Sequence, residues 1–598
     1  MNKSSISELQ LCSQSLLATG SYTCNHFSFD NQVILLIILT YFLILTRLIL
    51  SYNSRHIVTQ KTSVNPLKYK SEHFLLLSVI IYYATRSFFD AQATYTVLNQ
   101  TFDGVGLGQI DLDGSDDEYI ITNCTFTYAN NDAVNGGGMQ LYIEYRAKVY
   151  INNCSFTSCR SENEGGAIWA DISTGGKLTI DGMCRFSRCT NYEYDSNYHG
   201  GGAIAVFIDG ENSQLIFEDG ITYDTCYTRF KGGALFIQSS NAANVTLGQT
   251  LFLDCWSQSN GGAIYLRFYD DTSYFQIEGD ITIKNCYGGD SGGGMCVNVW
   301  SDIEINLSHT ILFDNCQSQR GGQLYIVTDY TGIKIRITGD IQFKQCHSSQ
   351  IAGGLYIDSV DGSLIEISNF TIDGCTSEQF AGGATSECYF GSQNIIRGLT
   401  IQNCETSGYG GGILLYVDGQ YSTTQVIDLT VTSCSSYGQG GGIFIEVREE
   451  SLIIFEGFCH VTNCTSQEEG GGIYVQTQGI LAEVDIKADL IIDSCTSMMD
   501  GGGMYVNFDF GGNVILRNKC KIINCKSEGG NGGGIYIQID FQYSHQFIMN
   551  DALIQECEAK ADPDKSYPTG YGGGMFLTGS GDYDPSTLRL DLKGMRIL

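Results

Sequence analysis

The sequence is poor in proline, histidine and basic residues, and each shortage excludes a class of protein. Only 4 Pro accompany 72 Gly, and the glycines do not follow the strict triplets of collagen. The 33 Lys and Arg are outnumbered by 65 Asp and Glu, a balance that repels phosphate backbones, so nucleic acid is not an expected partner. With 8 His and no paired CxxC units, a zinc site is not expected either.

The residues that are abundant are typical of β-strands separated by turns. Ile, Val, Tyr and Thr are frequent, and hydrophobic residues make up 43% of the chain, which excludes a disordered protein. At 598 residues the chain is too long for one compact core, so it must divide into domains or extend as a repeat. The composition favours the repeat.

The first ninety residues differ from the rest of the chain. They carry a net charge of +3, whereas the remainder is net −35. Residues 33–50 are apolar over about the length of a membrane span and predict a transmembrane helix. Residues 74–84 form a shorter apolar run that follows three lysines, as the hydrophobic part of a signal peptide does.

These features predict the domain organisation. The positive-inside rule places residues 51–73 in the cytoplasm and the chain after about residue 90 outside. We therefore expect a membrane or signal region at 1–91, a cap or lead-in segment at 92–120, and an extracellular repeat domain at 121–598. The alternative is that the upstream residues come from an extended gene model and do not belong to the mature protein.

The main signal is self-similarity at a period of about thirty residues. A glycine triplet or its stand-in recurs fifteen times between residues 137 and 573, mostly at intervals of 28 to 31. Two longer intervals, of 36 and 40 residues, hold polar insertions that can bulge out as loops. Such a period indicates a solenoid, in which each unit buries its apolar face against its neighbours.

Each period contains three short runs of alternating apolar and polar residues. In one period these are residues 473–475, 482–486 and 490–492. We predict an all-β, right-handed parallel β-helix of about 15 coils with three short strands per coil. Glycine suits a corner with positive φ or close backbone approach, and residues such as Asn285 and Asn315 can take left-handed corners and stack their amides.

A cysteine recurs once per repeat, in step with the glycines. The members of this predicted ladder are Cys124, Cys159, Cys189, Cys226, Cys255, Cys286, Cys316, Cys346, Cys375, Cys404, Cys434, Cys464, Cys495, Cys525 and Cys557. Equivalent Cα atoms about 4.8 Å apart suit a disulfide, but parallel Cβ vectors at that spacing are too far apart for relaxed geometry. Buried thiols that fill space are the preferred interpretation, with disulfides as the alternative. A bridge is easier to form where a second cysteine precedes the ladder by five residues, at Cys154, Cys184, Cys459 and Cys520.

The repeat resembles a known family of surface proteins. The motifs that carry the resemblance are GGAIW at 165, GGALF at 232 and GGAIY at 261, with FLDC, FDNC and FKQC at 252, 313 and 343. They are similar to the repeats of chlamydial polymorphic outer-membrane proteins, which are adhesins of the pectin-lyase-like β-helix class. The resemblance covers about residues 120 to 580 and implies architecture and, by analogy, adhesion. The chain departs from that family by carrying Cys where the family has Asn.

One aromatic position also recurs, two residues after the small residue of the glycine corner. If the apolar neighbours point inward, alternation turns these rings outward and makes an exposed stripe that could bind carbohydrate or protein. The alternative is that the rings stack on one another and stabilise the sheet. The candidate binding stripe consists of Tyr265, Tyr325, Tyr356, Tyr474, Tyr505 and Tyr536.

Two further kinds of site are suggested by short motifs. Asp111, Asp113 and Asp116 lie in a loose calcium-loop pattern that lacks the full ligand spacing, so a solvated acidic cap is the alternative. Asn99, Asn244, Asn306 and Asn369 begin N-x-Ser/Thr triplets and are candidate glycosylation sites in an extracellular domain.

The sequence therefore predicts a membrane-anchored or secreted, non-catalytic β-helix that acts as an adhesin or display element. Its expected partners are the membrane, through the N-terminal region, and an extracellular glycan or protein. The alternative is a polysaccharide lyase or hydrolase, although no motif supplies a catalytic set. The last repeat stops before its expected Cys, which suggests a longer parent protein or a missing partner.

Overall fold

The computed structural model describes residues 93–598, except residues 115, 131–134, 193–199, 270–272, 308, 329 and 588. The chain divides into two units, Met1–Phe89 and Asp90–Leu598. The predicted transmembrane helix at 33–50 and the signal-like run at 74–84 lie outside the described residues. In the described part, no helix is long and apolar enough to cross a membrane. The membrane anchor therefore stays a prediction.

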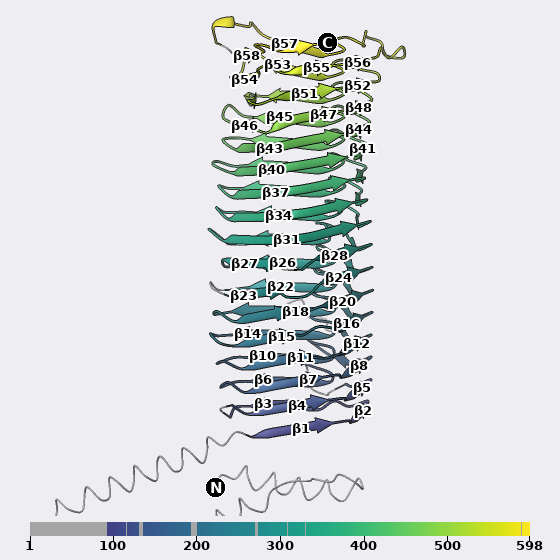
Figure 1. Cartoon of the computed structure of the whole chain (residues 1–598), viewed down its shortest axis with the longest axis vertical. Helices are drawn as coiled ribbons and strands as arrows, with labels where there is room; N and C mark the ends of the chain where they lie inside the picture. Colours follow the sequence, from purple (N-terminus) through teal and green to yellow (C-terminus); the bar gives the residue numbers. More distant parts are fainter. Residues whose placement is uncertain are drawn as a thin grey trace, which may run out of the picture. The chain divides into compact units, whose positions relative to one another are not determined.

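The second unit is a parallel β-solenoid made of three sheets (Figure 1). We call the sheets of 29, 16 and 14 strands sheet A, sheet B and sheet C. Because sheet C takes one two-residue strand from each coil, its 14 strands count about fourteen complete coils. The predicted parallel β-helix is confirmed. Part of the predicted lead-in segment already belongs to the first coil, since β1 (Thr94–Leu98) pairs in parallel with β4 (Glu118–Thr122).

One coil illustrates the path of the chain. Strand β45 (Ile473–Gln478) lies in sheet B, and β46 (Glu483–Ile486) and β47 (Asp489–Asp493) both lie in sheet A. The third side is β48 (Thr496–Ser497) in sheet C. The coil does have three sides, but two of the predicted runs share one sheet. The third side is too short to show an alternating pattern, so periodicity could not find it.

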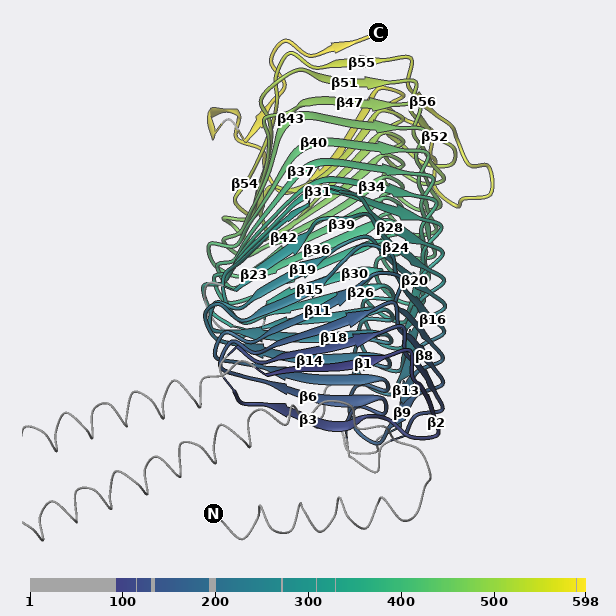
Figure 2. The same cartoon turned by 60° about the horizontal axis from the view of Figure 1, so that its bottom comes forward.

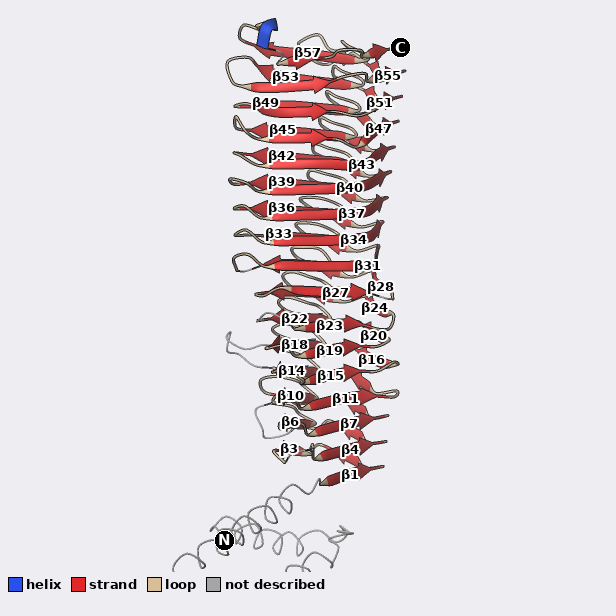
Figure 3. Cartoon of the chain, turned by 60° about the vertical axis from the view of Figure 1, so that its left-hand side comes forward, coloured by secondary structure: helices blue, strands red, loops and turns tan. Residues whose placement is uncertain are grey.

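Sheet A changes character along the solenoid (Figure 3). In the N-terminal coils it is built from two short strands per coil, such as β27 (Ile303–Leu307) and β28 (Ile311–Asp314). Further along, the two strands merge into one. The merged strands are β31 (Lys334–Lys344), β34 (Leu364–Asp373), β37 (Gln393–Gln402), β40 (Thr423–Thr432) and β43 (Leu452–Thr462). A register shift between Thr338 and Ile341 marks the start of this region.

The glycine corner is explained by backbone geometry in one representative coil. Gly470 has φ of +69°, a conformation that favours glycine. A Cβ on Gly471 would lie 2.3 Å from the carbonyl oxygen of Gly502 in the next coil. A Cβ on Gly472 would lie 2.8 Å from Cγ2 of Ile492. The three glycines thus serve a left-handed turn, a close approach between coils and a packing contact in the core.

The cysteine column is buried in the core and contains no disulfide among the described cysteines. All 21 of them are free, and only Cys557 is partly exposed. Sγ of Cys316 lies 3.2 Å from the carbonyl oxygen of Ile283 in the preceding coil, as a thiol donor would. Outside this column, burial raises the pKa of Cys459 and Cys520 to about 12, so both are neutral thiols at pH 7. The preferred thiol interpretation is confirmed.

Cys124 was assigned to this column, and that prediction is wrong. Residue Thr125 pairs with Ser155, and Ser155 with Arg185, which puts Cys124 level with Cys154 and Cys184. These three form a separate short column. Each lies at the corner before the second strand that its coil contributes to sheet A. Because both columns share a thirty-residue period, spacing alone could not separate them.

Candidate functional site

The predicted aromatic stripe is not an exposed surface. Tyr265, Tyr356, Tyr474, Tyr505 and Tyr536 are 1 to 9% exposed, and Tyr325 is half-buried. The rings lie outside the main core, as alternation predicts, but they stack from coil to coil. The centroids of Tyr474 and Tyr505 are 5.2 Å apart, and those of Tyr505 and Tyr536 are 4.8 Å apart. The expected exposure is therefore wrong and the stacking alternative is correct.

Two hydroxyl groups of the stripe also form hydrogen bonds inside the protein. Tyr356 donates to Oε2 of Glu387 at 2.9 Å, and Tyr505 donates to Oε1 of Gln538 at 3.0 Å. Burial raises the pKa of Tyr536 to about 12. A ring whose faces and hydroxyl are both occupied has little left to offer a ligand. Binding by this stripe is therefore not supported by its geometry.

The three candidate calcium ligands do not come together. Asp111 accepts a hydrogen bond from Gln109 at 2.9 Å, and Asp116 forms an ion pair with Arg146 at 2.9 Å. Asp113 is exposed. In the described residues no group of three or more His, Cys, Asp or Glu side chains could hold a metal ion.

The candidate glycosylation sites differ in access. Asn99 and Asn369 are exposed and have left-handed backbones, with φ of 53° and 64°, although Asn369 lies within β34. Asn244 lies in strand β19 (Asn244–Leu247), where it is half-buried, and Asn306 lies in strand β27. Glycosylation at all four stays a prediction.

Asparagines at another corner form the predicted amide ladder. Asn285 and Asn315 have φ of 54° and 52°. Asn315 donates to Oδ1 of Asn285 at 2.8 Å, and Asn285 donates to Oδ1 of Asp254 at 3.0 Å. This ladder of exposed polar side chains lies directly before sheet C.

An exposed aromatic row follows this ladder on the outer face of sheet C. It consists of Tyr227, Trp256 and Tyr287, in β17 (Tyr227–Thr228), β21 (Trp256–Ser257) and β25 (Tyr287–Gly288). The three residues are paired in register on consecutive coils. Trp256 is 41% exposed and Tyr287 is 38% exposed, while Tyr227 is half-buried.

The rings of the aromatic row are tilted with respect to one another. The centroids of Tyr227 and Trp256 are 4.6 Å apart with an interplanar angle of 32°, and those of Trp256 and Tyr287 are 6.1 Å apart at 58°. Tyr192 extends the group, with its ring under the guanidinium of Arg160 at 5.6 Å. Sequence reasoning missed this row. The signal was an aromatic residue directly after the ladder cysteine in three successive repeats.

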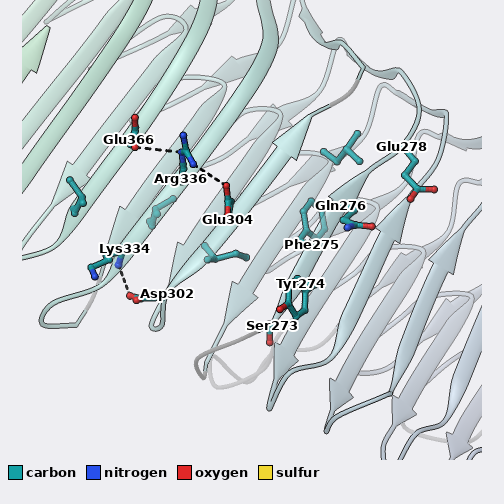
Figure 4. A pocket seen from close by; sticks show the side chains of 14 residues that line it. Ser273, Tyr274, Phe275, Gln276, Glu278, Asp302, Glu304, Lys334, Arg336 and Glu366 are labelled. Atoms are coloured by element: carbon teal, nitrogen blue, oxygen red, sulfur yellow. Dashed lines mark hydrogen bonds and ion pairs between the residues drawn. The ribbon is translucent and has the colours of Figure 1, made fainter. Parts of the chain in front are cut away.

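A second surface feature is an open trough of about 840 Å³ on the outer face of sheet A (Figure 4). It covers four adjacent coils. The first two contribute the short strands β23 (Tyr274–Ile277) and β27, and the next two contribute the continuous strands β31 and β34. Its polar and aromatic lining residues are Ser273, Tyr274, Phe275, Gln276, Glu278, Asp302, Glu304, Lys334, Arg336 and Glu366. Tyr274 is 61% exposed and stands at the N-terminal side of this trough.

The charged groups of the trough are paired across coils. Arg336 contacts Oε1 of Glu304 at 3.2 Å and Oε2 of Glu366 at 3.5 Å. Arg397 contacts Oε1 of Glu366 at 3.0 Å. The carboxylates of Glu304 and Glu366 therefore face guanidinium groups, unlike the paired carboxylates of a glycosidase. This arrangement is suited to hydrogen bonding with a polar ligand.

Comparison with known proteins identifies no relative. No protein-family model matches the chain, no curated protein matches it, and no solved structure matches it. The coil architecture is confirmed by the structure, whereas the resemblance to chlamydial polymorphic outer-membrane proteins stays a prediction.

Proposed function

We propose that the protein is a non-catalytic adhesin or display element, membrane-anchored or secreted, that binds an extracellular glycan through the aromatic row on sheet C. The observation that carries the proposal is the in-register exposure of Tyr227, Trp256 and Tyr287 on consecutive coils. Trp and Tyr combine an apolar ring face with a polar tip, which suits a sugar ring with its C–H faces and hydroxyl groups.

The polar ladder beside the row supports a saccharide over an apolar protein partner. Asp254, Asn285 and Asn315 each precede a residue of sheet C by two positions and offer carboxylate and amide groups. Amide groups can donate and accept hydrogen bonds, which matches the hydroxyl groups of a sugar. All these groups are mounted on regular coils, so the surface is organised before binding.

The charge of the solenoid favours a neutral glycan. Residues after 90 carry a net charge of −35, which repels acidic polysaccharides over distances up to a Debye length. The extracellular location rests on the apolar segments at 33–50 and 74–84 and on the glycosylation triplets. The same location brings the repeat domain into contact with glycans.

A glycan array probed with the full-length chain tests the proposal. We expect retention of neutral glycans without release of product, and a loss of affinity of about tenfold or more in the triple variant Tyr227→Ser, Trp256→Ser, Tyr287→Ser. Tyr421→Ser is the matched control, because Tyr421 is 72% exposed but lies outside the row. Release of oligosaccharides would instead favour the lyase or hydrolase alternative. Equal binding by the triple variant and the wild type would exclude the row as the site.

A further inference from the structure

We propose that the trough on sheet A is a second saccharide-binding site, so that one molecule cross-links two neutral polysaccharide chains. This inference rests on the proposed function, because it assumes that the aromatic row also binds a glycan. The trough and the row lie on different sheets and have one coil in common. This coil contains both Tyr274, which lines the trough, and Tyr287, which is the last residue of the row.

The trough extends toward the N-terminal coils through a second hollow. This hollow, of about 760 Å³, shares Tyr274 with the trough and is lined by the amide side chains of Asn212, Gln214, Asn241 and Asn244. Gln214, Asn244 and Tyr274 are paired in register on consecutive coils. An extended ligand lying along the solenoid axis would therefore meet one of these side chains per coil.

The chemistry of the combined trough fits a chain of neutral sugars. The exposed ring of Tyr274 offers an apolar platform, and the amides of Asn212 and Gln214 offer both donors and acceptors. Beyond Tyr274, the Arg336 guanidinium and the Glu304 and Glu366 carboxylates offer further groups for hydroxyl recognition. These ion pairs are partly exposed and weakly held, so sugar hydroxyls can share them.

The balance of charge in the trough excludes an acidic polysaccharide. Its lining has four carboxylates, at Glu278, Asp302, Glu304 and Glu366, and two basic groups, at Lys334 and Arg336. The neighbouring hollow adds a further carboxylate from Glu211. The surplus of negative charge opposes the binding of uronate or sulfate groups.

In each of these coils, the second of the two strands that the coil contributes to sheet A lies between the two sites. In Figure 2, β16 (Ile221–Asp224), β20 (Thr250–Leu253) and β24 (Ile281–Lys284) lie to the right of β15 (Gln214–Phe217), β19 and β23, and along the chain they come before the two-residue strands of sheet C. A straight chain on one face does not reach the other. Occupation of both faces thus joins two polysaccharide chains.

The test measures how many short neutral oligosaccharides bind one molecule. The oligosaccharide is the best neutral binder found on the array, and it is titrated calorimetrically into the detergent-solubilised full chain. We expect a stoichiometry of two for the wild type. One ligand should remain in the trough variant Tyr274→Ala, Gln214→Ala, and one in the triple row variant. Tyr421→Ala is the control that should keep both.

Cross-linking is then followed by light scattering with the matching long polysaccharide. Wild type should increase scattering, and either single-site variant should bind without the increase. A wild-type stoichiometry of one, unchanged by the trough variant, overturns the inference and leaves the proposed function intact. Absence of any binding overturns both. Cross-linking could also persist in both single-site variants. Such cross-linking would come from several molecules in one micelle, and it would overturn the inference.

Discussion

The N-terminal and C-terminal coils share one repeat but place their aromatic rings differently. In the N-terminal coils a stack of rings lies inside sheet A, at Phe126, Phe156, Phe186, Tyr223 and Phe252, with centroids 4.6 to 5.0 Å apart. In the C-terminal coils the same column holds aliphatic residues such as Ile401, Val431 and Ile492. There the continuous stack lies on the outer side of sheet B, from Phe444 through Tyr474, Tyr505 and Tyr536 to Phe576.

The difference shows how the third glycine position and the inner column are coupled. Where the inner residue is Phe186 or Phe252, the third position of the corner is Ala167 or Ala234. In several C-terminal coils the inner residue is β-branched, and a Cβ at Gly442 would lie only 2.7 Å from Cγ1 of Val461. The coupling does not extend to every coil, since Ala263 lies beside Ile283, Gly138 beside Phe156 and Gly294 beside Phe313. The backbone path is therefore the same along the solenoid. The residues that fill the inner column differ, being mostly aromatic in the N-terminal coils and aliphatic in the C-terminal coils.

The largest expected effect is the loss of one ring from the inner stack. Phe186→Ala should lower the free energy of unfolding by about 3–5 kcal/mol, because it removes contacts with two flanking rings and leaves a cavity. Ile401→Val, in the same column of the C-terminal coils, should cost only about 0.5–1.5 kcal/mol. Amide hydrogen exchange on the full chain would locate the loss. Equal losses at the two sites would contradict the comparison.

A methyl group at the glycine corner of a C-terminal coil should have the next largest effect. Gly442→Ala should lower the free energy of unfolding by about 1–3 kcal/mol, because the added Cβ meets both Val461 and the Gly472 carbonyl oxygen. The double variant with Val461→Ala tests the coupling. We expect its cost to be less than the sum of the two single costs, and a strictly additive result would show that the positions are independent.

Acid should weaken the C-terminal coils through His545. Burial, with a smaller effect of nearby Arg589, lowers the pKa of this imidazole below its ordinary 6.5. The unfolded chain then binds the proton more readily than the folded chain, so stability present above pH 6.5 is lost as the pH falls through that value. Thermal unfolding between pH 8 and 5 should show this loss. His545→Phe should reduce it, and an unchanged pH profile would assign the effect to other groups.

The smallest effect is expected at the exposed row of the N-terminal coils. Trp256→Ser should change the free energy of unfolding by less than about 0.5 kcal/mol, because the indole is 41% exposed on the outside of sheet C. Chemical denaturation of the variant beside Phe186→Ala would make the contrast direct. A loss as large as that of Phe186→Ala would mean that the row is structural and not a binding surface.

Much of the fold could be predicted because it depends on regular spacing. The left-handed corners at Asn285 and Asn315 and their stacked amides are confirmed, since both follow from residue type and position. The two-residue strands of sheet C could not be predicted, because they are shorter than any alternating pattern. The assignment of Cys124 failed for a related reason, as two columns shared one period.

The candidate site was predicted less well than the fold. The stripe at Tyr474, Tyr505 and Tyr536 was placed on the correct side of the strand, yet it is buried by stacking. The exposed row at Trp256 and Tyr287 was visible in the sequence only as an aromatic residue next to cysteine. Catalysis, cofactors, partners and localisation stay predictions.

The sequence by itself determined that coils of about thirty residues stack in parallel, because backbone hydrogen bonds between coils require turns of nearly equal length. Only the tertiary structure decided which outward side chains reach solvent. Alternation fixes the side of a strand on which a residue lies, but exposure depends on rings and loops about thirty residues away that cover it. For the same reason, the trough is a property of four adjacent coils and of no single repeat.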